Sequence, residues 1–321
     1  MAEKERLADA EVIGERRHLM ALAFRMLGTI TEAEDVVQET YTRWYRMGAA
    51  ERDAISSPRG WLTRAASRIC LDVLGSARMR RERYVGPWLP EPVPALAFGE
   101  PDPGGADPVD RVTFEESVST ALLVVLESMT PAERVVFVLH DVFAIPFGEI
   151  ATTIGRSPAA CRQLATSARR RVDQSRERRV TRREHDEVVR AFAAAARSGD
   201  LAALIGTLDT DVVMRADGGG LVTAARNPVV GAGRVARYLM GALYADRRTY
   251  EVREQRTNDG LGFALWEDGR ITGVVTLDVI DGRIAHVRMI RNPEKLSLWN
   301  TPPGEGAGAA SHRARPRRPD R

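Results

Sequence analysis

The stretch from Ala144 to Arg171 constrains the fold of this chain more than any other, because it carries the pattern of two short helices joined by a tight turn. Apolar residues at helical spacing predict the first helix over about Phe147 to Ile154. Gly155 follows at the position where a helix end favours a residue that can adopt a positive φ. Ser157 is a suitable N-cap, and Pro158 stands where a first helical residue needs no N–H, so a second helix is expected to begin there.

The second helix, expected to run to about Val172, has one apolar face and one basic face. Its outward residues are Arg162, Gln163, Thr166, Arg169 and Arg170. Arg and Gln near the start of such a helix suit base edges in a DNA major groove, whereas arginines further along suit phosphates. Residues 162–183 hold nine Arg against two acidic residues, which is typical of a segment with a polyanionic partner. We interpret the pair as a helix-turn-helix with its recognition helix second; the alternative is two amphipathic helices of an ordinary bundle.

The length of 321 residues exceeds what one compact core accommodates and predicts two or three domains. Cys70 and Cys161 are isolated thiols on expected helix faces, which indicates neither a disulfide framework nor a metal cluster, and no cofactor is expected. No apolar run approaches membrane-spanning length, and the N-terminus lacks the apolar core of a signal peptide. We therefore expect a cytoplasmic protein with no membrane contact.

Two helices are expected from about Val12 to Arg46. The second of them carries Asp35, Gln38 and Glu39 on the face opposite its apolar stripe. In isolation, such an acidic patch is explained as well by a solvated surface as by a binding face.

A polar loop from Gly48 to Gly60 precedes a basic helix that is expected to run from Trp61 to about Arg80. Aromatic residues beside cations at a loop–helix junction are typical of single-strand recognition, with rings or pockets for unstacked bases and cations for the backbone. The residues that fit this role are Ser56, Ser57, Arg59, Trp61, Arg64 and Arg68. For Trp61 alone, a place in the core is the simpler interpretation.

Residues 84–111 are rich in Pro and Gly and are predicted to form a linker rather than a helix. Trp88, Leu89 and Pro90 are unusual in a plain spacer, so this part of the linker is expected to dock on a surface.

Beyond the linker, a helix is expected from Val112 to Met129, and Thr130 then caps another helix. Together with the helix-turn-helix, these segments make a small four-helix domain.

Several of these features occur in a characteristic order. They are the run Ala33-Glu34-Asp35-Val36-Val37-Gln38-Glu39-Thr40, Trp61-Leu62 at the head of a basic helix, the Pro-rich linker, Leu-x-x-Met-Thr-Pro-Ala-Glu-Arg from Leu126 to Arg134, and the helix-turn-helix. This order resembles bacterial RNA polymerase sigma factors of the extracytoplasmic-function group. The resemblance implies sigma region 2 at 10–83, the linker at 84–111 and sigma region 4 at 112–176, both regions all-α.

The resemblance also implies partners and roles for the matching residues. Asp35, Gln38 and Glu39 would contact the basic coiled coil of the β′ clamp of core RNA polymerase, and region 4 would meet the β flap. The loop before Trp61, with the arginines behind it, would melt and read the −10 promoter element. The outward residues of the second helix in the helix-turn-helix would read the −35 element of promoter DNA.

From 182 to 298 the pattern changes to helices followed by strands, which predicts an α+β domain. Helices are expected at 182–198, 200–206 and 233–243, and strands at 212–215, 221–224, 250–257, 262–266, 271–280 and 283–290. Asp268-Gly269 and Asp281-Gly282 lie between alternating runs and predict tight hairpin turns. We expect a curved antiparallel sheet that forms a cone, followed by a disordered tail at 299–321.

This order of elements resembles the SnoaL-like fold, a sheet wrapped around a pocket. Three motifs support the likeness: Trp88-Leu89-Pro90-Glu91-Pro92, Asp217-Gly218-Gly219-Gly220 and Asn292-Pro293-Glu294-Lys295-Leu296. Together they resemble the SigJ-like subgroup of these sigma factors, in which a fused SnoaL-like extension is thought to regulate the sigma factor in cis. We therefore expect the linker motif to contact one or both of the other two, although each motif alone is explained equally well as a turn or a strand end.

Alternatives remain open from the sequence. The chain could be a ligand-responsive DNA-binding regulator that never engages polymerase, or its third domain could be an enzyme of the SnoaL-like fold. Asp278 is then the obvious carboxylate for proton transfer, but only His286 accompanies it, and we expect no catalytic residue. The pocket of the third domain could instead hold an unidentified small ligand.

Overall fold

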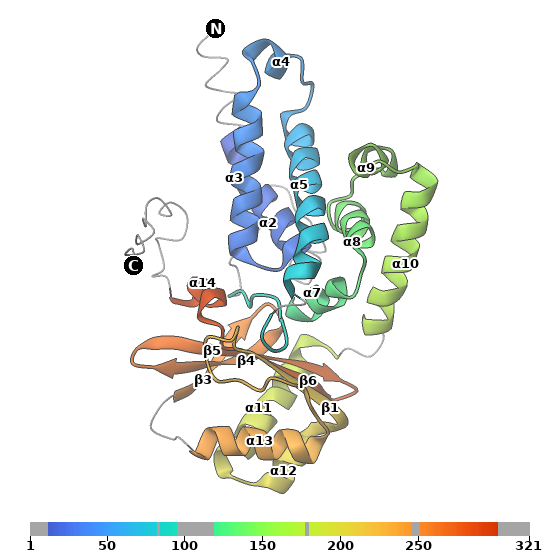
Figure 1. The fold of residues 1–321 in the computed structure, drawn as a ribbon. Helices are drawn as coiled ribbons and strands as arrows, with labels where there is room; N and C mark the ends of the chain where they lie inside the picture. The colour runs from blue at the N-terminus through green and yellow to red at the C-terminus, as the bar shows by residue number, and fades with distance from the viewer. Residues whose placement is uncertain (1–11, 82–83, 95–118, 177–179, 246–250, 301–321) are drawn as a thin grey trace.

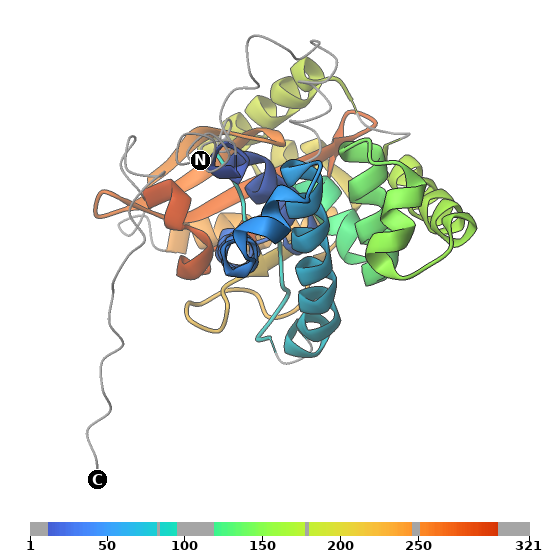
Figure 2. The ribbon, with the colours of Figure 1, turned by 90° about the horizontal axis from the view of Figure 1, so that it is seen from above.

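The computed structural model describes residues 12–81, 84–94, 119–176, 180–245 and 251–300. Two helical modules lie on one face of a β-sheet, and a second set of helices covers the opposite face (Figure 1). Seen from above, the two modules stand next to each other over the sheet (Figure 2). The sheet is therefore the layer that joins the parts of the molecule.

The first module is built from helices packed around a common apolar stripe. They are α2 (Arg16–Leu27), α3 (Ile30–Arg46), α4 (Ala49–Asp53) and α5 (Pro58–Arg81). Gly28 ends α2 with a φ of 82°, a conformation that favours glycine. The helix expected from Trp61 starts earlier, at Pro58, because Ser57 precedes it as a cap and its Oγ accepts a hydrogen bond from the N–H of Gly60 at 3.1 Å. The expected polar loop is correspondingly shorter and contains α4.

The second module contains the helix-turn-helix. Its elements are α7 (Thr120–Glu127), α8 (Pro131–Phe137), the π-helical turn η1 (Val138–Val142), α9 (Phe147–Ile154) and α10 (Pro158–Arg176). The helix expected from Val112 begins instead at Thr120, where Ser119 caps it, and residues 112–118 lie outside the described ranges. Gly155, with a φ of 65°, makes the turn between α9 and α10, so the predicted helix-turn-helix geometry is confirmed.

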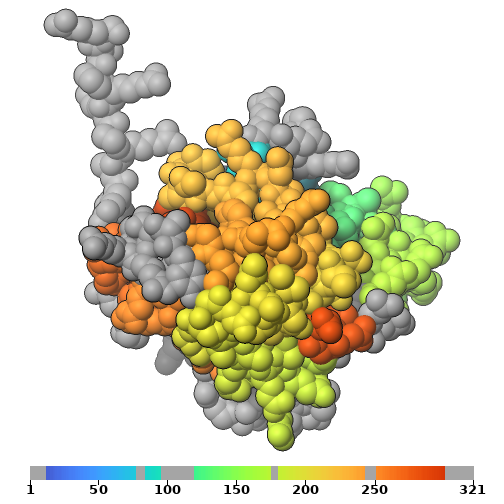
Figure 3. All heavy atoms as spheres, turned by 90° about the horizontal axis from the view of Figure 1, so that it is seen from below, coloured from blue at the N-terminus to red at the C-terminus, as the bar shows by residue number. Residues whose placement is uncertain are grey.

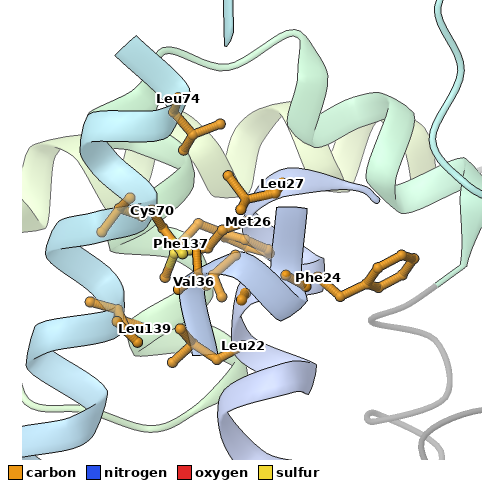
Figure 4. Packing of buried hydrophobic residues seen from close by; sticks show 14 of the residues in the cluster. Leu22, Phe24, Met26, Leu27, Val36, Cys70, Leu74, Phe137 and Leu139 are labelled. Carbon is orange, nitrogen blue, oxygen red and sulfur yellow. The ribbon is translucent and has the colours of Figure 1, made fainter. Parts of the chain in front are cut away.

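One apolar core runs through both modules. Phe137 and Leu139 of the second module lie among Leu22, Val36 and Cys70 of the first (Figure 4). The contacts come mainly from α5, which packs against both α8 and α9. Two segments that the sequence divides into separate helical domains therefore share a single core in this structure.

Two buried arginines lie at the joint between the modules. Arg134 of α8 is 3% exposed; its Nη1 donates to the carbonyl oxygen of Met26 at 2.7 Å and pairs with Glu127 at 2.7 Å. Arg25 of α2 is fully buried, 5.4 Å from the ring centroid of Phe143. Burial lowers the pKa of Arg25 to about 9 and that of Arg134 to about 10, so both remain cationic near neutral pH. The joint therefore holds charge as well as apolar surface.

The C-terminal domain is a twisted sheet with helices on one face. Its elements are α11 (Arg182–Ser198), α12 (Leu201–Thr207), β1 (Leu208–Asp217), β2 (Val229–Val230), α13 (Ala232–Ala245), β3 (Glu251–Thr257), β4 (Gly260–Glu267), β5 (Arg270–Ile280), β6 (Arg283–Ile290), the short 3₁₀ helix η2 (Pro293–Lys295) and α14 (Ser297–Asn300). The strand order is β2-β1-β6-β5-β4-β3, which confirms the predicted α+β class. Figure 3 views this domain from below, on the side of α11, α12 and α13.

Two details of the predicted sheet need correction, and a third is confirmed. The pairing of β1 with β6 is parallel, whereas an all-antiparallel sheet was expected. Residues 221–224 form no strand, because the chain after Asp217 turns back on itself, and the short strand β2 comes later. The two Asp-Gly hairpins are confirmed, since Asp268 and Asp281 have φ values of 48° and 50° and each is followed by a glycine with positive φ.

The two faces of the sheet have different partners. Toward α11 and α13 it presents an apolar cluster that includes Phe192, Val275 and Val287. Toward the helical modules it presents a smaller cluster in which Leu89 of the linker packs on Ile290 and other strand residues. The linker therefore lies against the sheet, on the side of the modules.

The C-terminal boundary extends beyond the predicted residue 298. The side chain of Trp299 donates from Nε1 to the carbonyl oxygen of Pro92 at 2.7 Å, and Asn300 pairs through its amide with the backbone of Ile271 at 2.9 Å in both directions. Residues 299 and 300 thus belong to the folded domain. The rest of the expected disordered tail, 301–321, lies outside the described residues.

Candidate functional site

The outward face of α10 is the candidate surface for duplex DNA. The predicted contact residues that are exposed there are Arg162, Gln163, Thr166 and Arg170. Arg169 is half-buried, because its Nε donates to Oδ1 of Asp141 in η1 at 2.5 Å. Cys161 is fully buried beneath this face, so it is a packing residue. Four of the five predicted residues therefore share one exposed face, and the fifth is held by an ion pair within the module.

The residues predicted to bind single strands divide into two groups, and the first group lies at the start of α5. Ser56, Ser57 and Arg59 are exposed there. Trp61 is half-buried and packs edge-on against Trp44, with ring centroids 5.3 Å apart. This aromatic residue is therefore anchored at the margin of the core while the residues before it reach solvent.

The second group, Arg64 and Arg68, faces α9 of the other module. Arg68 donates to the carbonyl oxygen of Thr153 at 3.1 Å and to that of Thr152 at 3.2 Å. These carbonyls belong to the last turn of α9, where helix carbonyls lack an intrahelical partner and attract cations. Nη1 of Arg64 lies 3.7 Å from Oε2 of Glu149. Both cations are thus engaged by the helix-turn-helix.

The acidic face predicted for partner binding lies on α3. Asp35 and Gln38 are exposed, and Glu39 accepts from Nε of Arg43, one turn later, at 2.8 Å. None of these three side chains contributes to the apolar core. The face is therefore open to a partner.

The carboxylate of Asp217 is the centre of the contact between the linker and the C-terminal domain. This residue, at the end of β1, is fully buried. Its oxygens accept from the hydroxyl of Tyr84 at 2.6 Å, the N–H of Leu89 at 2.9 Å, Nζ of Lys295 at 2.8 Å and the N–H of Gly219 at 3.1 Å. Four donors on one carboxylate are near its full capacity, so the charge is satisfied although it is buried.

Lys295 supplies the positive charge opposite Asp217 and also makes its own hydrogen bond to the linker. Its Nζ donates to the carbonyl oxygen of Leu89 at 2.5 Å and lies 4.2 Å from the ring centroid of Trp88 and 5.1 Å from that of Tyr84. Burial first, and then the hydrogen bond to Asp217, raise the pKa of Tyr84 above its usual range, so its hydroxyl remains a donor. We call this set of residues, Tyr84, Leu89, Asp217 and Lys295 with Asn292, the linker clamp.

Glycines after Asp217 let the clamp close. A Cβ on Gly219 would lie 2.5 Å from Nδ2 of Asn292, and one on Gly220 would lie 3.0 Å from Cβ of Val85. Both glycines also have positive φ, of 63° and 74°. Asn292 in turn donates from Nδ2 to the hydroxyl of Tyr84 at 2.9 Å. The Asp217-to-Gly220 motif is therefore a turn whose shape admits the linker.

The other side of the linker is bound by the first module. The N–H of Glu91 donates to the carbonyl oxygen of Gly28 at 2.8 Å, and Oε2 of Glu91 accepts from the N–H of Ile30, the first residue of α3, also at 2.8 Å. A Cβ on Gly28 would lie 3.0 Å from the ring of Trp88. Desolvation is the main cause that raises the pKa of Glu91 to about 7. The linker thus joins the first module to the sheet.

A second contact joins the sheet to the other module. Asp259, in the turn between β3 and β4, accepts from the N–H of Ala121 in the first turn of α7 at 3.1 Å. Burial raises the pKa of Asp259, and nearby Asp278 raises it further. Asp278 itself pairs with buried Arg288 at 2.5 Å. The carboxylate considered for an enzymatic role therefore belongs to this contact, where it lines a cleft beside Asp259 and Ala121, and it does not line the apolar pocket of the domain.

That pocket lies between the sheet, α11 and α13, with a volume of about 340 Å³. Its walls are mostly apolar and include Phe192, Tyr238, Phe263, Val275 and Met289. Its polar lining residues are Arg197, Thr223, Glu254 and Arg291. The described residues contain no cluster of side chains that could hold a metal ion.

Comparison with known proteins identifies the family. Residues 13–82 match the model of Sigma-70 region 2, and residues 119–172 match that of Sigma-70, region 4. The chain is 38% identical over 292 residues to the probable ECF RNA polymerase sigma factor SigI of Mycobacterium tuberculosis, a match that covers 91% of this chain and 95% of that protein. The chain is an extracytoplasmic-function (ECF) RNA polymerase sigma factor.

Two further likenesses cover nearly the whole sigma factor. It is 36% identical over 293 residues to the ECF RNA polymerase sigma factor SigJ of Mycobacterium tuberculosis, which covers 88% of this chain and 91% of SigJ. The crystal structure of that SigJ aligns with a TM-score of 0.67 at 35% identity, over 90% of this chain and 98% of the other. The three-part organisation, with a SnoaL-like α+β domain after regions 2 and 4, is thus a property of the full-length relatives.

As a sigma factor, the protein works with core RNA polymerase on promoter DNA at transcription initiation and is not itself an enzyme. Among the helices in the described ranges, none combines the length and the apolar composition that a membrane crossing requires.

The structure brings together the three sequence motifs around the linker. Leu89 packs on the sheet in the same apolar cluster as Leu296, and the ring of Trp88 lies 4.2 Å from Nζ of Lys295. Pro90 is buried beside Gly28 of the first module. Pro293 begins η2 and so places Lys295 under the linker.

Sequence reasoning missed four members of this contact, namely Tyr84, Gly28, Asp259 and Trp299, and it included Glu91 in the linker motif without its partner in the first module. Glu91 had a usable signal, because a lone acidic residue between prolines in an apolar stretch needs a partner. For the other four, no local pattern pointed to the contact.

Proposed function

We propose that the C-terminal domain of this sigma factor holds regions 2 and 4 in a closed, inactive arrangement, and that initiation requires the two regions to separate. The observation that carries the proposal is the single core shared by the two regions. The −35 and −10 elements are about 25 base pairs apart, or roughly 85 Å along B-form DNA. Two modules in direct contact cannot reach both elements together.

Specific residues carry the proposed promoter contacts. In the open state, Arg162, Gln163 and Thr166 read base edges of the −35 element, while Arg169 and Arg170 bind its phosphates. The loop residues Ser56, Ser57 and Arg59, with Trp61, bind the melted −10 strand. Arg64 and Arg68 extend that strand-binding surface once α9 no longer holds them. Their engagement with α9 supports the proposal that the closed arrangement blocks the −10 function.

The proposed polymerase contacts use two other surfaces. The face of α3 with Asp35, Gln38 and Glu39 meets the basic coiled coil of the β′ clamp, and its exposure and charge support this assignment. Region 4 meets the β flap. Both partners place the work of the protein in the cytoplasm.

The linker is the element through which the C-terminal domain acts. Leu89 and Lys295 tie the linker to the sheet, while Glu91 ties the same linker to the start of α3. Asp259 holds the start of α7 at the same time. Regions 2 and 4 are thus fixed to one rigid support at separate points, so weakening these contacts favours the open state.

Reconstituted transcription tests the polymerase assignment. Core RNA polymerase, the full-length protein and a template with −35 and −10 elements should yield a promoter-dependent transcript. The double charge reversal Asp35→Arg with Glu39→Arg should weaken polymerase binding at least tenfold, whereas Glu187→Arg on the exposed surface of α11 should not. Tight duplex binding without any transcript would favour a DNA-binding regulator that never engages polymerase.

A further inference from the structure

The pocket of the C-terminal domain is lined by none of the side chains that hold the linker. All residues of the linker clamp, as well as Asp259 and Arg288, lie outside its lining. Small side chains keep it open, since Ala193, Ala196, Ala224 and Ala242 line it where larger residues could fill the space. A domain that served only as a support would gain stability by filling such a space.

The lining indicates the chemistry of an occupant. Phe192, Tyr238 and Phe263 give it aromatic walls, and its volume of about 340 Å³ is at the lower end of the range for small-molecule sites. At the rim, Arg197 and Glu254 are partners of each other at 3.8 Å. The remaining charge in the lining is Arg291.

Arg291, which lines the pocket, has donor capacity to spare. Its Nη1 donates to the carbonyl oxygen of Thr223 at 3.2 Å, but its buried Nε has no hydrogen-bond partner among the described residues. Buried donors without a protein partner are uncommon in folded proteins, so this Nε is available to an acceptor from outside the chain. An anionic oxygen of a ligand would satisfy this guanidinium in a largely apolar surrounding.

Arg291 also connects the pocket to the linker clamp. Its backbone N–H donates to the carbonyl oxygen of Asp217 at 2.7 Å, and the N–H of Asn292 donates to the same oxygen at 2.9 Å. Thr223, the acceptor of the Arg291 side chain, belongs to the loop that starts at Gly218, and a Cβ on Gly218 would lie 2.9 Å from Cβ of Ala224. One loop and one residue, Arg291, therefore serve both as pocket wall and as support of Asp217.

We propose that this pocket binds a small apolar organic anion whose carboxylate, sulfonate or phenolate oxygen pairs with Arg291, and that binding loosens the linker clamp. The second part rests on the regulatory role proposed above. A ligand that draws the guanidinium from Thr223 frees the loop after Gly218, and the support of Asp217 weakens. Ligand binding and linker docking then oppose each other, and this opposition is reciprocal.

Two dyes that differ in one group test the site in the full-length protein. 1-Anilinonaphthalene-8-sulfonate has the apolar rings and an anion, and N-phenyl-1-naphthylamine has the same rings without the anion. The sulfonate should bind at one site per chain. Arg291→Met should lower its affinity tenfold or more and leave the neutral dye unchanged, while Arg270→Met, on the exposed start of β5, should change neither.

Ala196→Phe fills the pocket and should lower the affinity for both dyes. This variant tests the pocket independently if the Arg291→Met protein proves unstable. Unchanged sulfonate binding in Arg291→Met would refute the anion site. If Ala196→Phe leaves the binding of both dyes unchanged, or if no single saturable site is found, the pocket is not the binding site.

The coupling between ligand binding in the pocket and docking of the linker is measured without polymerase. Saturating sulfonate dye should speed hydrogen exchange at the amides of Leu89 and Glu91, and Asp217→Asn should tighten dye binding about fivefold or more, as expected for a typical coupling between sites. If neither changes while the dye binds at Arg291, the coupling is refuted and the site stands. Because these measurements omit transcription, their failure is distinct from failure of the sigma-factor mechanism.

Discussion

At the residue scale, a single buried carboxylate organises the contact between the linker and the C-terminal domain of this sigma factor. Asp217 collects donors from the linker, from its own turn and from Lys295, and the lysine spans the same linker residue through its carbonyl. Because both charges are buried, removing one leaves the other without compensation, and the loss of such a partner is costly. The clamp therefore depends on a pair rather than on the sum of its contacts.

Asp217→Asn should release the linker while leaving the domain folded. A buried lysine without its counter-charge costs about 3–5 kcal/mol, so exchange at the amide of Leu89 should accelerate by roughly 10²- to 10⁴-fold. Native-state hydrogen exchange measures this directly. The same substitution at exposed Asp281, in a hairpin turn, is the control and should have no effect; equal protection of Leu89 in both variants would contradict the role of the clamp.

Glu91 should make linker docking dependent on pH. Burial raises its pKa from 4.5 to about 7, so the docked state favours the protonated form. The stabilisation is then fully present below about pH 4.5 and is lost as the pH rises through 7, by at most about 3 kcal/mol.

Glu91→Gln, which stays neutral, removes this dependence. The urea midpoint of the wild type should fall relative to that of Glu91→Gln between pH 5 and 8, whereas Glu187→Gln should follow the wild type. Parallel curves for wild type and Glu91→Gln would show that Glu91 does not titrate in this range.

At the element scale, the helix-turn-helix is the part of the fold that the local sequence predicts most completely. Gly155, the Ser157 cap and Pro158 fix the ends of α9 and α10 by local chemistry, so the structure follows the prediction closely. The face of α10 was also predictable, except that Arg169 is tied to Asp141. That pair joins residues 28 positions apart, and no local pattern encodes it.

The errors elsewhere share this cause. The parallel pairing of β1 with β6 depends on strands far apart in the chain, and hydrophobic alternation is the same for either direction. Trp299 extends the domain because it meets Pro92, more than 200 positions earlier. The linker motifs could be grouped from the sequence, but the carboxylate-centred geometry that joins them could not.

Two positions on α10 should separate base reading from phosphate binding. Arg162→Ala should cost about 1–3 kcal/mol on promoter DNA and relax the preference at one base pair of the −35 element. Arg170→Ala should weaken binding to specific and scrambled duplexes alike and reduce the slope of log affinity against log salt by about one. Fluorescence anisotropy of the polymerase holoenzyme over a salt series checks both. Equal losses on both duplexes for Arg162→Ala would exclude its role as a base reader.

At the scale of the whole molecule, the closed arrangement brings together three parts that follow one another in the chain, namely region 2, region 4 and the C-terminal domain. Regions 2 and 4 share a core, and the sheet supports both through the linker and through α7. Leu298 adds a direct link, since it packs against the shared helical core from the end of the C-terminal domain. The last described turn of the chain, α14, is therefore part of the contact between the C-terminal domain and the helical modules.

Truncation after Leu296 should open the molecule. It removes Leu298 from the helical core and the hydrogen bond from Trp299 to the linker, so small-angle scattering should report a larger radius of gyration and transcription from a fixed amount of protein should rise. Truncation after Asn300 retains these contacts and is the matched control. The same radius for both truncated proteins would contradict a role for α14 in closure.

The guanidinium groups buried between regions 2 and 4 bear on whether closure can be undone. When the regions part, Arg134 gives up the carbonyl of Met26 and regains water, so hydration of a cation offsets part of the unfavourable wetting of aliphatic side chains. An interface of the same size made only of hydrocarbon would cost more free energy to separate. This interface is therefore closer to thermodynamic balance, as the proposed opening requires.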